Sequence, residues 1–487
     1  MKNKLFLVVC ILFFTTTSCE KDFLDTVPEN TISNLQLAEN PAALQAIING
    51  VYANLRTYGV SGTTFHVDYG HMGVKVALDM MGQDMTMSAF HWYAFFNNYD
   101  GRVQTSSRTR LIWNTYYQQI AEVNSVIAAI DAGTTDPTAK ALLGQALAMR
   151  GLFSHVLARV YSHTYIGHES DMSIPLPNGE NFEGKPRATV GEAYTQMASD
   201  LEAAITLLEG FDRSTKQEVN QAVAQGFLAA VYLEMGNWSG AASMANAARS
   251  AYAPMSSSEW MDGFSNINNA EWMWGADIDN ESSTSFASFF SHFDNTVGGY
   301  AGALGVYKLI DANLYSMIPD SDIRKSAFVH PVDLNPDYPV LPAYANIKFR
   351  DASSSSFEGD YVYMRAAEMY LIEAEALARS GDNAGGAQVL FDLVSTKDPE
   401  YTLSTATGDD LVEEVYLNRR IELWGEGTGW FDLKRLKKPL VRDYEGTNHA
   451  SFGIYNFEPE ANPFRFQLPE DEINANDAIS AGDQNPN

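Results

Sequence analysis

The sequence predicts a mainly α-helical protein: a tetratricopeptide-like helical repeat scaffold of about four helix hairpins, with long loop-rich insertions and a few short strands. Two observations carry this prediction. Helical periodicity recurs in several long segments, and one segment, 217–250, has the spacing of small and large apolar residues that is typical of a tetratricopeptide helix pair. Generic packing of alanine-rich helix pairs is the alternative reading of the same pattern.

The first 18 residues have the composition of a bacterial lipoprotein signal peptide. Two lysines, an apolar stretch and small residues precede Cys19. Cleavage before Cys19 would also remove Cys10 and leave one thiol at the new N-terminus, so a disulfide is excluded. We therefore expect lipidation of Cys19, with residues 19–40 as a lipidated tether. Thr16 departs from the usual pattern, which has leucine three positions before the cysteine.

Membrane attachment is expected through the lipid anchor only. Acyl chains add about 0.8 kcal/mol per buried methylene, so several chains would hold the protein at a membrane surface. After Phe14 the sequence has no apolar run that approaches the roughly 20 residues of a transmembrane helix.

The first predicted helix begins at Pro41, a residue favoured in a first turn, and runs to about residue 56. Residues 57–109 are rich in Gly, Ser, Met and aromatic residues without a sustained period, and we expect a long ordered insertion there. Thr189 and Glu192 form a plausible capping box that would open a later helix. The helices predicted after the first insertion are 111–131, 138–161 and 189–208.

Four hairpins follow from these helices. Residues 217–250 read as two helices joined at Gly236 and Asn237, and residues 363–394 are a weaker copy. The remaining two hairpins pair 41–56 with 111–131, and 138–161 with 189–208. Together they would form a curved scaffold.

The middle of the chain has a different character. Residues 254–362 are rich in Ser, Asn, Pro and aromatic residues, and we expect loops with a short strand near Glu271–Ile278. Loops of this length in a compact protein are usually functional. The predicted organisation is therefore a helical part with insertions, 41–253, and a loop-rich ligand region with a C-terminal helical part, 254–487, interwoven in one globular body.

The charge balance excludes one class of partner. The chain has 61 acidic and 32 basic residues, a net charge of -29. Such a surface repels phosphate backbones, so nucleic acid is not expected as a partner.

Three C-terminal segments carry a family resemblance: RAAEMYLIEAEALARSG, LNRRIELWGEGTGWFDLKR and FQLPEDEINAN, in this order. With them the chain resembles the SusD/RagB family of Bacteroidota surface lipoproteins. The resemblance implies a location on the extracellular face of the outer membrane. It also implies that the protein binds an oligosaccharide and delivers it to a SusC-like TonB-dependent transporter. Some members of the family capture peptides instead.

The candidate ligand-binding residues are aromatic and amide side chains in two loops. Sugar C–H faces pack on aromatic rings, while hydroxyl groups seek polar side chains. The resemblance implies that the ligand-contacting aromatics come from the first insertion and from a loop at about 280–305. For each single aromatic residue, burial in a loop core is the alternative. The candidates are Trp92, Tyr93, Phe96, Asn98, Phe290 and Tyr300.

Signals for an enzyme are weak, and we expect no catalytic residues, no cofactor and no metal. His168 and Glu169 lack the second histidine of a zinc helix, because position 172 is Met. Arg419, Arg420 and Glu422 could clamp a carboxylate, but such clusters more often stabilise a helix and its neighbours. A surface-anchored glycan hydrolase remains the alternative function.

Overall fold

The computed structural model describes residues 40–176, 184–296, 300–333, 335–351 and 356–487. The predicted signal peptide, Cys19 and nearly all of the predicted tether lie outside these ranges. Within them the protein is mainly α-helical, with four separate two-stranded sheets. The predicted fold class is confirmed.

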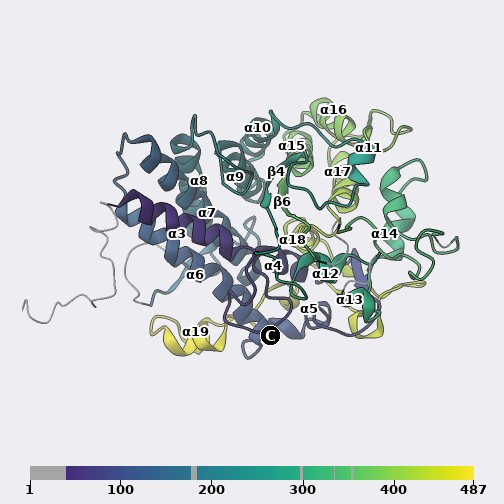
Figure 1. Cartoon of the computed structure of the whole chain (residues 1–487), viewed down its shortest axis with the longest axis horizontal. Helices are drawn as coiled ribbons and strands as arrows, with labels where there is room; N and C mark the ends of the chain where they lie inside the picture. The colour runs from purple at the N-terminus through teal and green to yellow at the C-terminus, as the bar shows by residue number, and fades with distance from the viewer. Residues whose placement is uncertain (1–39, 177–183, 297–299, 334, 352–355) are drawn as a thin grey trace, which may run out of the picture.

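Four helix hairpins follow one another across the molecule (Figure 1). Helices from different hairpins also pack against each other, namely α6 on α7, α8 on α9 and α10 on α15, so the array is continuous. The hairpins are α3 (Pro41–Asn54) with α6 (Ser107–Ala129), α7 (Pro137–Tyr161) with α8 (Val190–Leu207), α9 (Gln221–Met235) with α10 (Trp238–Arg249), and α15 (Ala366–Arg379) with α16 (Asn383–Val394).

Local signals explain where these helices begin and end. Thr189 and Glu192 form the predicted capping box at the start of α8. Gly236 ends α9 with a φ of 73°, a left-handed conformation that glycine adopts without steric cost. Side chains that cap the first turns of the other hairpin helices are Asn40, Ser106, Asp136, Asn220, Asn237 and Asp382.

Helix α7 forms the centre of the core. Among the described residues it alone has the length and hydropathy of a membrane-spanning helix, but 94% of its most apolar window is buried inside the protein. The core helix of a globular protein has the same properties.

The insertion at 57–109 contains a helix that periodicity did not predict. Helix α4 (Gly70–Asp79) is buried on nearly every side. The helix is only 10 residues long, contains Gly73, and buries the polar side chains of His71 and Asp79, so its composition is not that of a typical core helix. The insertion continues through β1 (Met85–Met87), α5 (Ala94–Asn97) and a short 3-10 turn.

Two of the strand pairs in the described part of the chain join segments that are far apart in the sequence. β4 (Trp272–Ala276), which confirms the strand predicted near 271–278, pairs with β6 (Tyr361–Arg365). β1 pairs with β5 (Lys308–Ile310). The other two sheets join β2 (Met172–Pro175) to β3 (Arg187–Thr189) and β7 (Leu440–Val441) to β8 (Asn456–Phe457).

The remaining helices come from the second half of the sequence, and α12, α13 and α14 lie together on one side of the molecule (Figure 1). Helix α17 packs against α15 and α16. These helices are α11 (Ser257–Trp260), α12 (Phe289–Phe293), α13 (Tyr300–Ala303), α14 (Ala312–Met317), α17 (Asp409–Glu422), α18 (Gly429–Arg435) and α19 (Glu470–Ala475).

A buried ion network explains the charged C-terminal residues. Arg365 pairs with Glu422 at 2.7 Å and with Glu426 at 2.8 Å, and Arg324 pairs with Glu422 at 2.9 Å. All four side chains are almost fully buried. Since its carboxylate oxygens are occupied by two arginines and the indole N–H of Trp260, Glu422 has a structural role.

Candidate functional site

Two segments that are far apart in the sequence meet beside the β1–β5 pair. Beyond the strands, the backbone N–H of Ser88 donates to the Tyr307 carbonyl at 3.1 Å. The Ser88 hydroxyl donates to the Gly305 carbonyl at 2.6 Å and accepts from the Tyr307 N–H at 2.8 Å. The first insertion therefore lies against the end of the loop at about 280–305 that was predicted to contact the ligand.

Aromatic and imidazole rings from both segments form one cluster at this place. Trp92 stacks on His66 with ring centroids 5.1 Å apart, and its centroid lies 4.6 Å from that of Tyr300. Tyr300 in turn lies 4.7 Å from Phe286, which is 54% exposed. We call the partly or fully exposed rings of this cluster the aromatic platform: His66, His91, Trp92, Phe286 and Tyr300.

Three of the predicted aromatic residues do not belong to this platform. Tyr93, Phe96 and Phe290 are only 1%, 0% and 0% exposed. The Tyr93 hydroxyl is hydrogen-bonded to that of Tyr69 at 2.6 Å. Their rings are packed in the core and present no face to a ligand, so the structure corrects the prediction for these three residues and leaves Trp92 and Tyr300.

Asn98 closes helix α5 and remains partly exposed. Its side-chain amide donates to the Asp100 carboxylate at 2.6 Å, and its side-chain oxygen accepts from the Asp100 N–H at 3.1 Å. The side chain is therefore engaged in a local turn.

Buried groups support the platform from behind. Nε2 of His292 lies 3.1 Å from the His66 carbonyl oxygen, and the ammonium of Lys308 donates to the His292 carbonyl at 3.2 Å. Burial lowers the pKa of Lys308 to about 7, and burial together with Lys308 lowers the pKa of both His91 and His292. These two imidazoles are therefore neutral at pH 7.

Two imidazole nitrogens of the platform have no partner in the part of the chain that the structure describes. Nδ1 of His66 and Nδ1 of His91 are buried atoms that find no hydrogen-bond partner among the described residues. Most buried polar atoms in proteins are hydrogen-bonded to protein or to water. A water molecule or a ligand hydroxyl is the kind of group that would satisfy these atoms.

The sequence did not single out His66 or Phe286 as candidate ligand-binding residues. His66 follows a stretch rich in Gly, Ser and Thr and belongs to no periodic pattern or motif. Its stacking on Trp92 arises only when the chain folds.

A second candidate surface is a polar hollow of about 480 Å³ beside α9. It has few rings, mainly Phe211 and Tyr252, and its other lining side chains include Arg213, Lys216 and Asp360. Burial raises the pKa of Asp360 to about 6. This hollow offers charge and amide groups rather than an aromatic surface.

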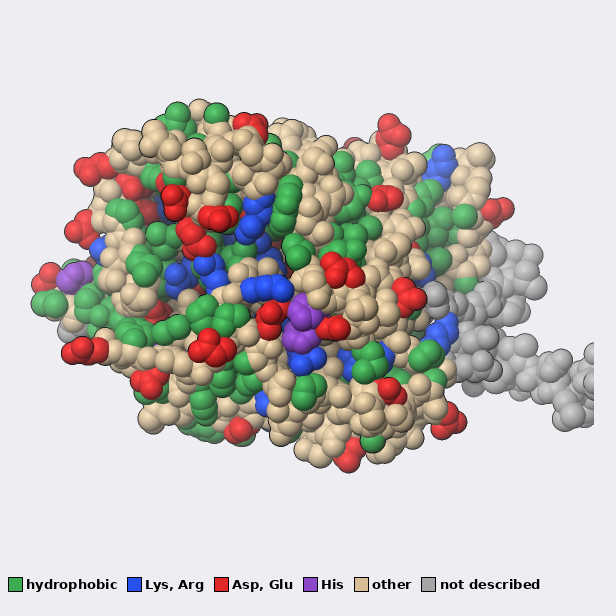
Figure 2. Space-filling model, turned by 180° about the vertical axis from the view of Figure 1, so that it is seen from behind, with side chains coloured by type: hydrophobic (Ala, Val, Ile, Leu, Met, Phe, Trp, Pro, Cys, Tyr) green, Lys and Arg blue, Asp and Glu red, His purple; other side chains and the backbone are tan. Residues whose placement is uncertain are grey.

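Charge is unevenly distributed over the surface. On the face opposite the view of Figure 1, Lys and Arg side chains gather in a central band, while Asp and Glu are spread around it (Figure 2). The net charge of -29 therefore does not describe every part of the surface.

Two family models match the chain. One, described as starch-binding and associating with the outer membrane, matches residues 22–233. The other, described as the SusD family, matches residues 343–487. No curated protein is significantly similar in sequence to this chain.

Solved structures have the same fold. A SusD-like carbohydrate-binding protein of Bacteroides vulgatus ATCC 8482 superposes with a TM-score of 0.81 at 27% identity, covering 92% of this chain and 98% of that chain. Surface glycan-binding protein A of Bacteroides uniformis has a TM-score of 0.67 at 18% identity, with coverages of 92% and 99%. A laminarin-binding SusD-like protein gives 0.67 at 18%, with coverages of 91% and 98%.

The two matched segments together span well over half of the chain, and they include all three motifs that carried the resemblance. The resemblance stated from sequence is confirmed, and the chain belongs to the SusD family.

Proposed function

We propose that this protein is a non-catalytic cell-surface binding protein that captures an oligosaccharide on the aromatic platform and delivers it to a SusC-like TonB-dependent transporter. The observation that carries the proposal is the contact between Trp92 and Tyr300, which joins two loops into one partly exposed surface of rings. The solved relatives described as carbohydrate-binding or glycan-binding support the class of ligand.

The chemistry of the platform favours a neutral sugar. Sugar rings present C–H faces that pack on aromatic rings, and their hydroxyl groups need hydrogen-bond partners. The Nδ1 atoms of His66 and His91, which are buried and have no partner among the described residues, would reach a ligand hydroxyl through a bridging water. Because His91 and His292 are uncharged at pH 7, the platform does not depend on an ion pair with the ligand.

The proposed location is the extracellular face of the outer membrane, with the protein anchored by a lipid on Cys19. The signal-like residues 1–18 and the description of the family as associating with the outer membrane support this location. Co-purification of the protein with a transporter barrel from solubilised outer membranes tests the proposed partner.

The test of binding is a titration of the purified protein with neutral glycans, host glycans and peptides by calorimetry. Each mixture is then analysed by chromatography for cleavage products. Saturable binding of at least one oligosaccharide without products is the expected result. Cleavage products would overturn the proposal in favour of a hydrolase, and binding of peptides alone would overturn the oligosaccharide as cargo.

A further inference from the structure

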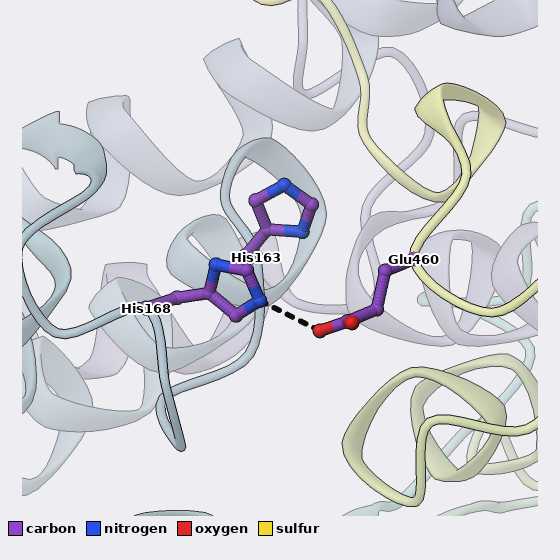
Figure 3. A group of neighbouring side chains, drawn as sticks. All are labelled: His163, His168 and Glu460. Atoms are coloured by element: carbon purple, nitrogen blue, oxygen red, sulfur yellow. Dashed lines mark hydrogen bonds and ion pairs between the residues drawn. The ribbon is translucent and has the colours of Figure 1, made fainter.

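Two histidines and a glutamate from distant parts of the chain converge at the end of α7. His163 and His168 lie in the loop between α7 and β2, and Glu460 lies in the loop after β8. Figure 3 shows the two imidazole rings one above the other, with the Glu460 carboxylate at the edge of His168. Each residue offers one ligand atom, and these three atoms lie within 4.8 Å of one another.

The orientation of His168 is set by a second carboxylate. Its Nδ1 lies 2.7 Å from Oδ2 of Asp171, and its Nε2 lies 2.6 Å from Oε1 of Glu460. Metal-binding histidines usually donate their other ring N–H to a carboxylate, which fixes the ring and its tautomer. Asp171 therefore stands where such an orienting group is expected, and Nε2 is the atom presented to Glu460.

His163 completes the group. Its ring stacks on that of His168 with centroids 4.1 Å apart and planes inclined by 18°. Neither of its nitrogens makes a hydrogen bond to another described residue, and the ring is only partly buried. A free imidazole nitrogen is thus available beside a histidine and a carboxylate that are already in contact.

We propose that His163, His168 and Glu460 form a three-ligand site for a transition-metal dication such as Zn²⁺, with a fourth position left for water. Two histidines and one glutamate are a ligand set that proteins use for zinc. Imidazole ligands favour zinc and its neighbours over Ca²⁺ and Mg²⁺, which prefer oxygen.

Binding requires a small rearrangement. Zinc–ligand bonds of about 2.0–2.2 Å place tetrahedral ligand atoms about 3.4 Å apart. The widest separation in the group, at most 4.8 Å, must therefore close by up to about 1.4 Å as the His163 ring turns out of the stack. The 2.6 Å contact between His168 and Glu460 must open at the same time. The metal takes the place of a proton on Nε2 of His168, and that proton leaves to solvent.

Cations face this site and compete with the metal. The Lys437 ammonium lies 2.9 Å from Oε1 of Glu460, the oxygen that His168 also contacts. Arg465 and Lys434 lie near His163. Asp171 and Glu169 supply negative charge on the same loop. The metal must displace Lys437 from Glu460, so removal of this lysine is expected to strengthen binding.

The test is a calorimetric titration of the purified, tag-free and EDTA-treated protein with ZnCl₂, with CaCl₂ and MgCl₂ as comparisons. We expect one zinc ion per chain, a rise in Tm with zinc, and no binding of calcium or magnesium at this site. His163→Ala, His168→Ala and Glu460→Gln should each weaken zinc binding at least tenfold. His330→Ala is the matched control, since His330 is a half-exposed histidine beside Asp333 and should leave binding unchanged.

The Lys437→Met variant distinguishes a specific zinc site from loss of binding through misfolding. A misfolded variant would not bind zinc more tightly than the wild type. Tighter binding in this variant supports the proposal. Absence of saturable zinc binding, or binding that the three ligand variants leave unchanged, would overturn it.

Discussion

The position of Trp92 is fixed by neighbouring residues that are themselves buried in the core. Tyr93, the next residue, is buried and hydrogen-bonded to Tyr69, and its ring packs edge-on against His292. His292 also contacts Trp92 edge-on. Because Tyr93 and His292 are fixed in the core, Trp92 is fixed at the surface before any ligand arrives, which reduces the entropy lost on binding.

Trp92→Ala should therefore lower the affinity for the captured glycan about tenfold, because the loss of one aromatic contact removes about 1–2 kcal/mol. Calorimetry of the variant and the wild type measures the change. Trp238→Ala is the matched control: Trp238 is a partly buried tryptophan on α10, beside Arg379 and outside the platform. Equal losses in the two variants would mean that the platform is not the binding surface.

At this scale the sequence could indicate which loops carry partly exposed aromatic rings, but not which rings of each loop face outward. In residues 92–96, Trp92 and Phe95 are partly exposed while Tyr93 and Phe96 are buried. Which rings face outward is decided by contacts such as Tyr93 with Tyr69, which no local pattern reveals. The same limit applies to Phe290, which lies in the core beside Gly359.

Helix pairs in the scaffold approach closely where small residues face the partner helix. A Cβ atom at Gly386 in α16 would lie 2.8 Å from the Ala374 carbonyl oxygen and 3.2 Å from the Ala378 nitrogen, both in the backbone of α15. A Cβ atom at Gly50 in α3 would meet nothing within 4 Å. The two glycines therefore have opposite consequences for packing.

Gly386→Ala should lower the free energy of unfolding by about 1–3 kcal/mol, because the two backbones must separate. Gly50→Ala should raise it by about 0.5–1 kcal/mol, because alanine loses less backbone entropy in a helix. Urea denaturation of both variants measures the two changes. A stabilising Gly386→Ala would contradict the close approach of α15 and α16.

The hairpins could be predicted because their signals are local. Pro41, Thr189 with Glu192, and Gly236 mark helix ends through contacts within a few residues. Helix α4 was missed because it is short, contains Gly73 and buries the polar residues His71 and Asp79.

Buried ion pairs tie the C-terminal helices to the rest of the molecule. Glu375 on α15 accepts hydrogen bonds from Arg379 at 2.9 Å and from both terminal nitrogens of Arg435, at 2.6 and 2.8 Å. The carboxylate is 1% exposed. Although burial opposes its ionisation, the two arginines lower the pKa of Glu375 from 4.5 to about 2.

This lowered pKa predicts how stability depends on pH. The ionised carboxylate stabilises the folded state fully above the unfolded pKa of 4.5, and the stabilisation is lost as pH falls from about 5 toward 2. Glu375→Gln should lower the free energy of unfolding by about 3 kcal/mol at pH 7, and by progressively less below pH 5. Denaturant titrations at several pH values measure this difference.

Glu413→Gln is the matched control, because Glu413 pairs with Lys438 at the surface and is 57% exposed. This variant should differ little from the wild type at any pH, since exposed pairs contribute about 0–1 kcal/mol. A difference for Glu375→Gln that stays constant across this pH range would contradict the ion-pair account.

At the scale of the whole molecule, the sequence predicted the helical scaffold and proposed two loops for ligand binding, but it did not predict that these loops lie side by side. The pairing of Met85 with Ile310 brings the first insertion to the loop region. Such pairing between three-residue strands leaves no periodic trace in the sequence. The sequence also could not show that His163, His168 and Glu460 lie close together, because they come from two loops that are distant in the chain.

The most direct measurement of the central claim is a crystal structure of the protein with the glycan that binds most tightly in the titration. The account predicts a sugar ring against Trp92 and Tyr300, with hydroxyl groups near His66 or His91. A glycan bound instead in the polar hollow lined by Arg213, Lys216 and Asp360 would contradict it.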